Sequence, residues 1–181
     1  MAQTYIYFSG TLPMLFFGEK PALSIETFDE DAARLTSAKT AALLKKATLY
    51  NPGEADLPSA VRKYYAWESA LRNSWLEFRK KFRSDAGDFK RDNADFYSEI
   101  APALTQAANC TDLLEAEKII DRLRWSMLDS FCAGHYNDVD FLAIYRIKLQ
   151  ILAKYAVRTA ENGNRALEDI LQSLTDANKT N

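Results

Sequence analysis

The sequence contains few cysteines, histidines, glycines and prolines. Its 181 residues include two cysteines, one histidine, six glycines and five prolines. Cys110 and Cys132 do not form a C-x-x-C motif, and two thiols are too few for a disulfide framework in a chain of this length. A single histidine, His135, cannot supply a multi-histidine metal site and leaves no spare residue for a Ser-His-Asp arrangement. Redox, zinc and hydrolase chemistry are therefore disfavoured.

Long apolar runs and a strong excess of one charge are also missing. The net charge is −2, so the chain lacks the overall basic field that supports non-specific nucleic-acid binding. The aromatic-rich opening "YIYFSGTLPMLFFGEKP", residues 5–21, is interrupted by Ser, Gly and Pro and follows no basic region, unlike a signal peptide or a membrane span. The apolar segment from Phe141 contains three cations. We expect no nucleic-acid binding and no membrane insertion. The protein is expected to be cytoplasmic, or peripheral on the inner face of the membrane through a complex.

The residues that are present favour helices. Apolar side chains recur every three or four positions through most of the chain, which is the helical period. We expect a short helix from Ile25 capped by Ser24, a second short helix capped by Thr36, and a long helix of about 24 residues from Ser59. The apolar stripe of this long helix consists of Val61, Tyr64, Trp67, Leu71, Trp75, Phe78 and Phe82.

The second half of the chain predicts two more long helices. The first is capped by Thr111 and ends before Gly134, and the second is capped by Asp138. Because few residues separate them, we expect an antiparallel hairpin. A shorter helix around Pro102, a terminal helix from Asn164 and a frayed tail at 175–181 complete the prediction. The fold class is all-α, a multi-helix, bundle-like single domain over residues 1–181.

The aromatic opening should close the core from the other end of the chain. We expect its apolar side chains to be largely buried against the two last long helices, with Pro13 and Gly18 marking a turn. The side chains expected inside are Tyr5, Tyr7, Phe8, Leu12 and Leu15.

The last long helix carries one narrow polar stripe on an otherwise apolar surface, which is typical of a central core helix. The stripe consists of Arg146, Gln150, Lys154 and Arg158. Lys148 departs from the stripe and lies on an apolar side, where its ammonium must reach the surface or pair with a carboxylate. A role in partner binding and a role as a catalytic lysine are the alternatives.

"GHYNDVD" brings His135, Asp138 and Asp140 together, as in a metal or acid/base cluster. Both aspartates are also explained by the start of a helix, Asp138 as its N-cap and Asp140 by its charge in the first turn. Arg124 should pair with Asp121 within one helix, and Trp125 is expected in the core. The chain has no glycine-rich phosphate loop, nucleophile elbow or paired-carboxylate motif, so we predict no catalytic residue, no metal and no cofactor.

A basic cluster follows the first long helix. It is either a solvated face or a contact patch for an acidic partner. Its members are Arg79, Lys80, Lys81, Arg83, Lys90 and Arg91.

Two stretches together resemble a bacterial family of uncharacterised proteins encoded within V-type ATPase operons. They are "YIYFSGTLPMLFFGEKPALSIETF" and "LRWSMLDSFCAGHYNDVDFLAIYRIKLQILAKY". The matching residues are Tyr5, Tyr7, Leu12, Pro13, Leu15, Pro21, Leu23, Ser24 and Phe28 in the first, and Leu123, Arg124, Trp125, Leu128, Asp129, His135, Tyr136, Asp138 and Asp140 in the second. Asn137 departs from the family's aromatic residue.

The resemblance implies a non-catalytic partner of a V-type ATPase, either an accessory protein or a component similar to the all-helical d-type protein of the central stalk, which connects the rotor shaft to the membrane ring. Such a protein would act through contacts with other stalk subunits. The polar cluster that could make contacts, or hold the fold together, is Arg124, Trp125, Asp129, His135, Tyr136, Asp138, Asp140 and Lys148. The alternatives are a free-standing helical binding or regulatory module, and an enzyme that uses His135 with the two aspartates.

Overall fold

The computed structural model describes residues 5–53, 56–80, 90, 95–158, 165, 168 and 170–172. Within these ranges the regular structure is entirely helical, as predicted. The named helices are α1 (Ile6–Thr11), α2 (Ile25–Leu35), α3 (Ala38–Lys46), α4 (Ser59–Lys80), α5 (Ile100–Ala108), α6 (Leu113–Cys132) and α7 (Val139–Val157). Among the described helices, none combines the length and the apolar character that crossing a membrane requires.

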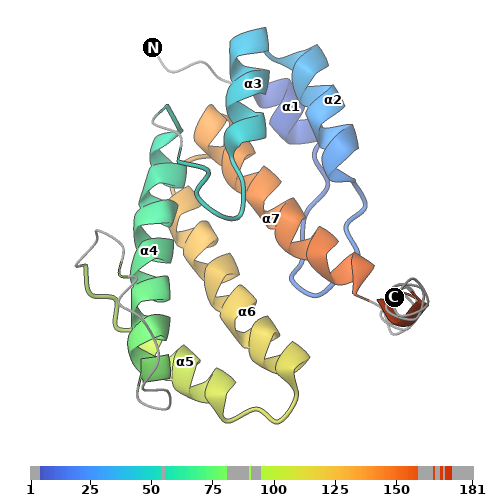
Figure 1. Ribbon diagram of the computed structural model, residues 1–181. Helices are drawn as coiled ribbons and strands as arrows, with labels where there is room; N and C mark the ends of the chain where they lie inside the picture. Colours follow the sequence, from blue (N-terminus) through green and yellow to red (C-terminus); the bar gives the residue numbers. More distant parts are fainter. Residues whose placement is uncertain are drawn as a thin grey trace, which may run out of the picture.

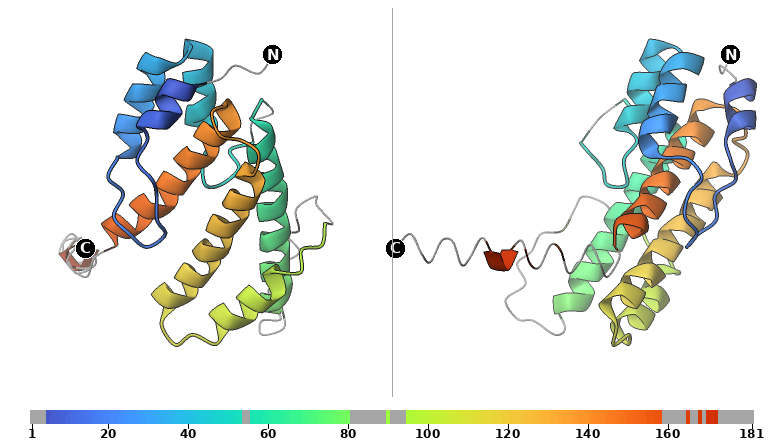
Figure 2. Two further views of the ribbon diagram at one scale, coloured as in Figure 1. Left: turned by 180° about the vertical axis from the view of Figure 1, so that it is seen from behind. Right: turned by 90° about the vertical axis from the view of Figure 1, so that its right-hand side faces the viewer.

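Helix α7 lies in the middle of the molecule (Figure 1). Helices α1, α2 and α3 group around its first half, while α4, α5 and α6 form a second group along its other side (Figures 1 and 2). Nine residues of α7 are buried, including Leu142, Ile147 and Leu149. The prediction of a central core helix is therefore correct.

Helix starts follow the expected capping chemistry, with two shifts of one residue. The Ser24 hydroxyl accepts from the Thr27 N–H at 3.1 Å and begins α2, as predicted. Thr36 does not cap α3, because its hydroxyl donates to Ala32 O at 2.6 Å and closes α2; Ser37 is the cap. Asp112, not Thr111, begins α6 by accepting from the Leu114 N–H. Side-chain oxygens next to each other in sequence compete for the same cap.

The end of α6 and the start of α7 agree with the sequence prediction. Gly134 has a φ of +87°, a left-handed conformation that glycine adopts without strain after a helix. Asp138 begins α7 by accepting from the Phe141 N–H at 3.0 Å. Ion pairs then connect the two helices in opposite order along the chain: Asp129 with Lys148, Asp121 with Lys154, and Glu117 with Arg158.

The aromatic opening is only half buried. Tyr5 and Phe8 lie in the core, as expected, whereas Leu12 and Leu15 are only partly buried. Tyr7 is 73% exposed, so its predicted burial is wrong. The reason is helix α1. Its N-cap residue Tyr5 and its residue Phe8, three positions apart, face the core, which leaves Ile6 and Tyr7 on the opposite side.

The turn in the opening lies at one of the two predicted positions. Gly18 has a φ of +87°, and the Glu19 N–H donates to Phe16 O at 3.3 Å across it. Pro13 lies outside the turn, in a stretch without regular structure, and its carbonyl accepts from the Tyr145 hydroxyl at 2.7 Å.

The apolar stripe of α4 is buried in the first half of the helix and more exposed in the second half. Val61, Tyr64, Trp67 and Leu71 are buried, but Trp75 is 36% exposed and Phe82 lies outside the described residues. On α6, Leu113, which begins the apolar face of the helix, is 84% exposed. The terminal helix predicted from Asn164 and the tail at 175–181 lie largely or wholly outside the described residues.

Candidate functional site

The residues that the sequence singles out lie in separate places. His135, Asp138 and Asp140 meet at the corner between α6 and α7, where Tyr136 is exposed. The other predicted residues occupy two further positions along α6 and α7. Arg124 belongs to a buried network, and Trp125, Asp129 and Lys148 form a group of their own.

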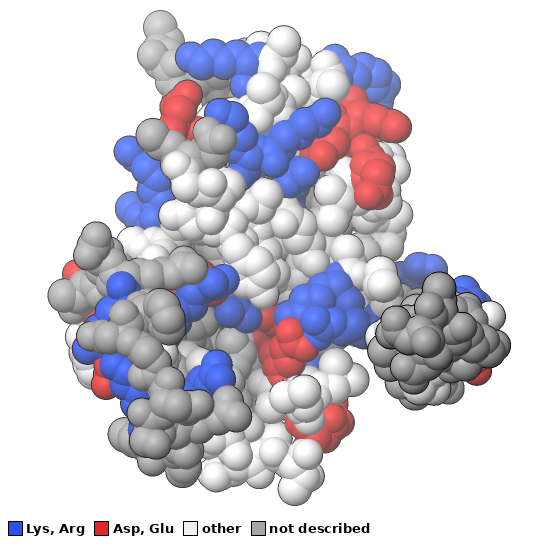
Figure 3. Space-filling model, in the orientation of Figure 1, with Lys and Arg blue, Asp and Glu red and all other residues white. Residues whose placement is uncertain are grey.

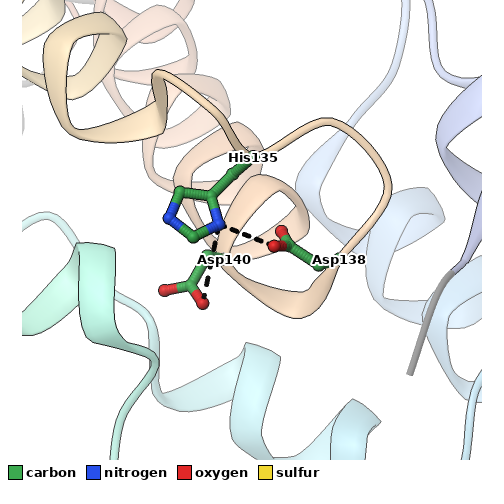
Figure 4. A group of neighbouring side chains, drawn as sticks. All are labelled: His135, Asp138 and Asp140. Carbon is green, nitrogen blue, oxygen red and sulfur yellow. Dashed lines mark hydrogen bonds and ion pairs between the residues drawn. The ribbon is translucent and has the colours of Figure 1, made fainter. Parts of the chain in front are cut away.

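At the corner, two carboxylates face one imidazole nitrogen (Figure 4). His135 Nδ1 lies 2.6 Å from Asp138 Oδ2 and 4.0 Å from Asp140 Oδ2. The second oxygen of each aspartate is already in use: Asp138 Oδ1 caps α7, and Asp140 Oδ1 accepts from the Ala60 N–H at 2.6 Å. Asp140 therefore caps α4, which comes 80 positions earlier in the chain. The sequence placed Asp140 in the first turn of α7 and contained no signal of this contact.

Hydrogen bonding also controls the ionisation of Asp138. Burial by itself would raise the pKa of this carboxyl group, but hydrogen bonds from His135 and from the Phe141 N–H outweigh it and hold the pKa below its ordinary value. One imidazole and two carboxylates could in principle hold a cation. Because both carboxylates complete helix ends, the observed geometry is that of a structural corner.

The cap on α4 gives a measurable prediction. Asp140→Ala should lower the free energy of unfolding by about 1–2 kcal/mol, because the Ala60 N–H and the Ser59 hydroxyl lose their acceptor. Urea unfolding followed by circular dichroism measures the change. Glu30→Ala, on an exposed position of α2, is the control and should unfold like the unmodified protein. Equal stability of the two variants would contradict the capping role.

A buried ion network joins α4, α6 and α7. Glu68, 1% exposed, accepts from Arg124 through both carboxylate oxygens at 3.0 Å and from Arg72 Nε at 2.9 Å. Arg124 also donates to Asp121 at 2.7 Å, which is the predicted intrahelical pair. Burial by itself would lower the pKa of Arg124. The neighbouring carboxylates of Glu68 and Asp121 raise this pKa by more than burial lowers it, so the guanidinium remains charged.

Asp121 is the centre of this network and has no exposed surface. Besides Arg124, it accepts from the Lys154 ammonium and, at 2.6 Å, from the Tyr155 hydroxyl. The sequence predicted Lys154 as part of a polar stripe and did not indicate its partner. A charge in the middle of an apolar helix face requires a pairing partner, but the identity of that partner depends on long-range packing.

Lys148 pairs with a carboxylate, as one of the predicted possibilities required. Its ammonium contacts Asp129 and lies 4.6 Å from the centroid of the Trp125 ring. Trp125 itself is partly buried against the core, and its ring packs in a T-shaped arrangement with the Phe17 ring. Next to them, burial raises the pKa of the Cys132 thiol to about 11, so this cysteine is a weak nucleophile at neutral pH.

The basic cluster is only partly described. Lys80 and Lys90 pair with Glu77 at 3.6 and 3.0 Å, and Arg79 is exposed. Lys81, Arg83 and Arg91 lie outside the described residues. On the face shown in Figure 3, uncharged surface crosses the middle of the molecule, and Lys and Arg side chains lie above and below it.

A cleft between α4 and α6 was not predicted. It has a volume of about 440 Å³, and its apolar lining includes Leu71 and Trp75 from α4 and Leu113 and Ile120 from α6. Arg72 and Arg124 also line it. The only sequence signal was indirect, since Trp75 and Leu113 continue the apolar stripes beyond the part that the helices bury.

Comparison with protein-family models, with curated proteins and with solved structures found no match. The relationship to the V-type ATPase operon family therefore stays a hypothesis that rests on the two resembling stretches.

Proposed function

We propose that the protein is a non-catalytic, helical component associated with a bacterial V-type ATPase, and that it works through contacts with stalk subunits. The resemblance suggests this partner. The observation that carries the proposal is a set of exposed apolar side chains on the two resembling stretches. Ile6 and Tyr7 are 67% and 73% exposed, and Tyr136 is 72% exposed. We name these three residues the α1 surface.

Hydrogen bonds hold the two segments of the α1 surface in place. The Tyr5 N–H donates to Asn137 O, and the Ser9 hydroxyl donates to Asn137 Oδ1, both at 2.5 Å. Asn137 directly follows Tyr136, so α1 and the corner loop present their apolar side chains from one fixed arrangement. Large exposed aromatic and aliphatic side chains on a rigid support are typical of protein-binding surfaces.

The charged residues support a connecting role by holding the helices together rather than by contacting a partner. Arg124, Asp140 and Lys148 each pair with another helix of the same chain. Asp138 binds His135 within the corner between α6 and α7. They hold the helices in fixed positions, which suits a part that transmits force between neighbours. Binding would then depend on apolar contacts, with the paired charges providing stiffness.

Affinity isolation tests this proposal. The tagged protein, expressed in its own organism, is recovered under conditions that keep the ATPase assembled, and stalk subunits are quantified by mass spectrometry. We expect stalk subunits with the unmodified protein and at least a tenfold loss with Ile6→Ser/Tyr7→Ser. Met14→Ser is the matched control, because Met14 is also on the N-terminal stretch and is 79% exposed.

Recovery of the unmodified protein without ATPase subunits would overturn the proposal. If another protein is then recovered and its recovery depends on Ile6 and Tyr7, the protein is a free-standing helical binding module that uses the same surface.

A further inference from the structure

We propose that the cleft between α4 and α6 binds a small organic acid with one carboxylate and an apolar body. This inference concerns a different surface from the α1 surface and stands independently of the ATPase association. Its three supports are the lining of the cleft, the position of one arginine, and the balance of charge around it.

The lining suits the apolar part of such a ligand. Leu71, Trp75, Leu113 and Ile120 form walls around a volume of about 440 Å³, within the range of small-molecule sites, roughly 300–1,000 Å³. Leu113 is 84% exposed and Trp75 is 36% exposed. Both would lose contact with water when an apolar group enters the cleft.

Arg72 supplies a prepared group for the carboxylate. Its guanidinium lies 4.6 Å from the centroid of the Tyr50 ring, and its Nε donates to Glu68 at 2.9 Å. These two contacts fix the plane of the guanidinium. Its two terminal nitrogens have no hydrogen-bond partner within the part of the chain that the structure describes. A fixed guanidinium with free N–H groups can bind a carboxylate through two parallel hydrogen bonds.

The charges around the cleft favour an anion. Arg72 and Arg124 share Glu68, and Lys154 and Arg158 share Glu117, while Asp121 pairs with Arg124 and Lys154. Within this described group, four cations meet three carboxylates, so one positive charge is left without compensation. Glu117 also lines the cleft, and its two cationic partners reduce its repulsion of a bound carboxylate.

Arg72 is accessible without being loose. Its side chain is 35% exposed, compared with 11% for Arg124. All three guanidinium nitrogens of Arg124 donate hydrogen bonds to Glu68 or Asp121. We therefore assign the ligand contact to Arg72 and a supporting role to Arg124, which keeps Glu68 in position beneath Arg72.

Titration with octanoate tests the site. Binding is followed by backbone amide chemical shifts and by tryptophan fluorescence, in a variant in which Trp125 is replaced by Phe. Trp75 in the cleft and the buried Trp67 then remain as the two emitters. Octanol and octylamine are the neutral and cationic probes. We expect saturable octanoate binding with a Kd on the order of 1 mM or tighter, shifts confined to the cleft, and at least tenfold weaker binding of both other probes.

Variants separate the carboxylate contact from general apolar binding. Arg72→Gln should weaken octanoate binding at least tenfold and leave octanol binding unchanged, while Arg72→Lys should recover part of the affinity. Arg79→Gln is the matched control, because it removes an exposed arginine from the same helix outside this cleft. Circular dichroism confirms that each variant is folded.

The inference is wrong if octanol binds as tightly as octanoate, or if Arg72→Gln binds octanoate like the unmodified protein. It is also wrong if an acidic amphipathic peptide binds here while octanoate does not, since the cleft would then be a docking surface for another protein. None of these outcomes depends on whether the affinity isolation recovers stalk subunits through the α1 surface.

Discussion

Arg146→Met is expected to lower the free energy of unfolding by about 3–5 kcal/mol, because it breaks a buried ion pair and leaves one charge without compensation. Arg146 is 7% exposed and donates to both oxygens of Asp29, at 2.8 and 2.9 Å. It also donates to the carbonyl oxygen of Ala47 at 2.8 Å. Methionine retains most of the apolar stem, so the loss comes mainly from the guanidinium. Urea unfolding followed by circular dichroism measures it.

Two further variants identify the cause of this loss. Arg34→Ala removes an exposed arginine from a pair with Asp31 on the same helix as Asp29, and it should leave the stability unchanged. Adding Asp29→Asn to Arg146→Met should restore part of the stability, since the carboxylate that lost its partner is removed as well. A loss below about 1 kcal/mol for Arg146→Met, the size expected of a surface pair, would contradict a structural role.

Asp121→Asn should be comparably damaging, at about 3–5 kcal/mol. The variant keeps the shape of the side chain but removes the charge that Arg124 and Lys154 share. It also replaces one acceptor with a donor next to the Lys154 ammonium and the Tyr155 hydroxyl. Glu115→Ala, on the same helix and paired with Lys118 at the surface, is the control and should have little effect.

The Asp121 variant has a second, independent signature. Burial and the neighbouring Asp121 carboxylate both raise the pKa of Tyr155. Removing the carboxylate charge should therefore allow Tyr155 to ionise at a lower pH, which absorbance at 295 nm measures against a Tyr155→Phe reference. An unchanged tyrosine titration, together with unchanged stability, would show that Asp121 does not organise the network.

Local chemistry explains which parts of the fold the sequence predicted. Ser24, Gly134 and Asp138 act within a few residues of themselves, so their roles as helix boundaries can be inferred from short stretches. The caps at Thr36 and Thr111 were wrong by one residue because Ser37 and Asp112 offer equally suitable oxygens.

Burial was harder to predict because it depends on what each helix packs against. Tyr7 and Trp75 are aromatic and follow the apolar spacing of their segments, yet both are exposed. The helical period shows that a residue shares a face with its neighbours, but the length of that face covered by a partner is set by the tertiary structure.

The candidate site was predicted least well. The residues of the corner were found together because His135, Asp138 and Asp140 are close in sequence. Arg72 and Arg124 line one cleft from two helices, and Glu68 beneath them connects the two. A single sequence contains no signal for such a contact across 56 positions.

The central position of α7 has a consequence for how the protein is made. Asp29 and Arg146 are 117 positions apart, and the Phe28 ring stacks on Tyr145 with centroids 5.7 Å apart. During synthesis, α2 and α3 therefore wait on the order of ten seconds before the helix that covers them is translated. Until then Phe28 and Leu44, fully buried in the finished protein, have no complete core to enter. The nascent chain is expected to depend on chaperones until α7 has left the ribosome.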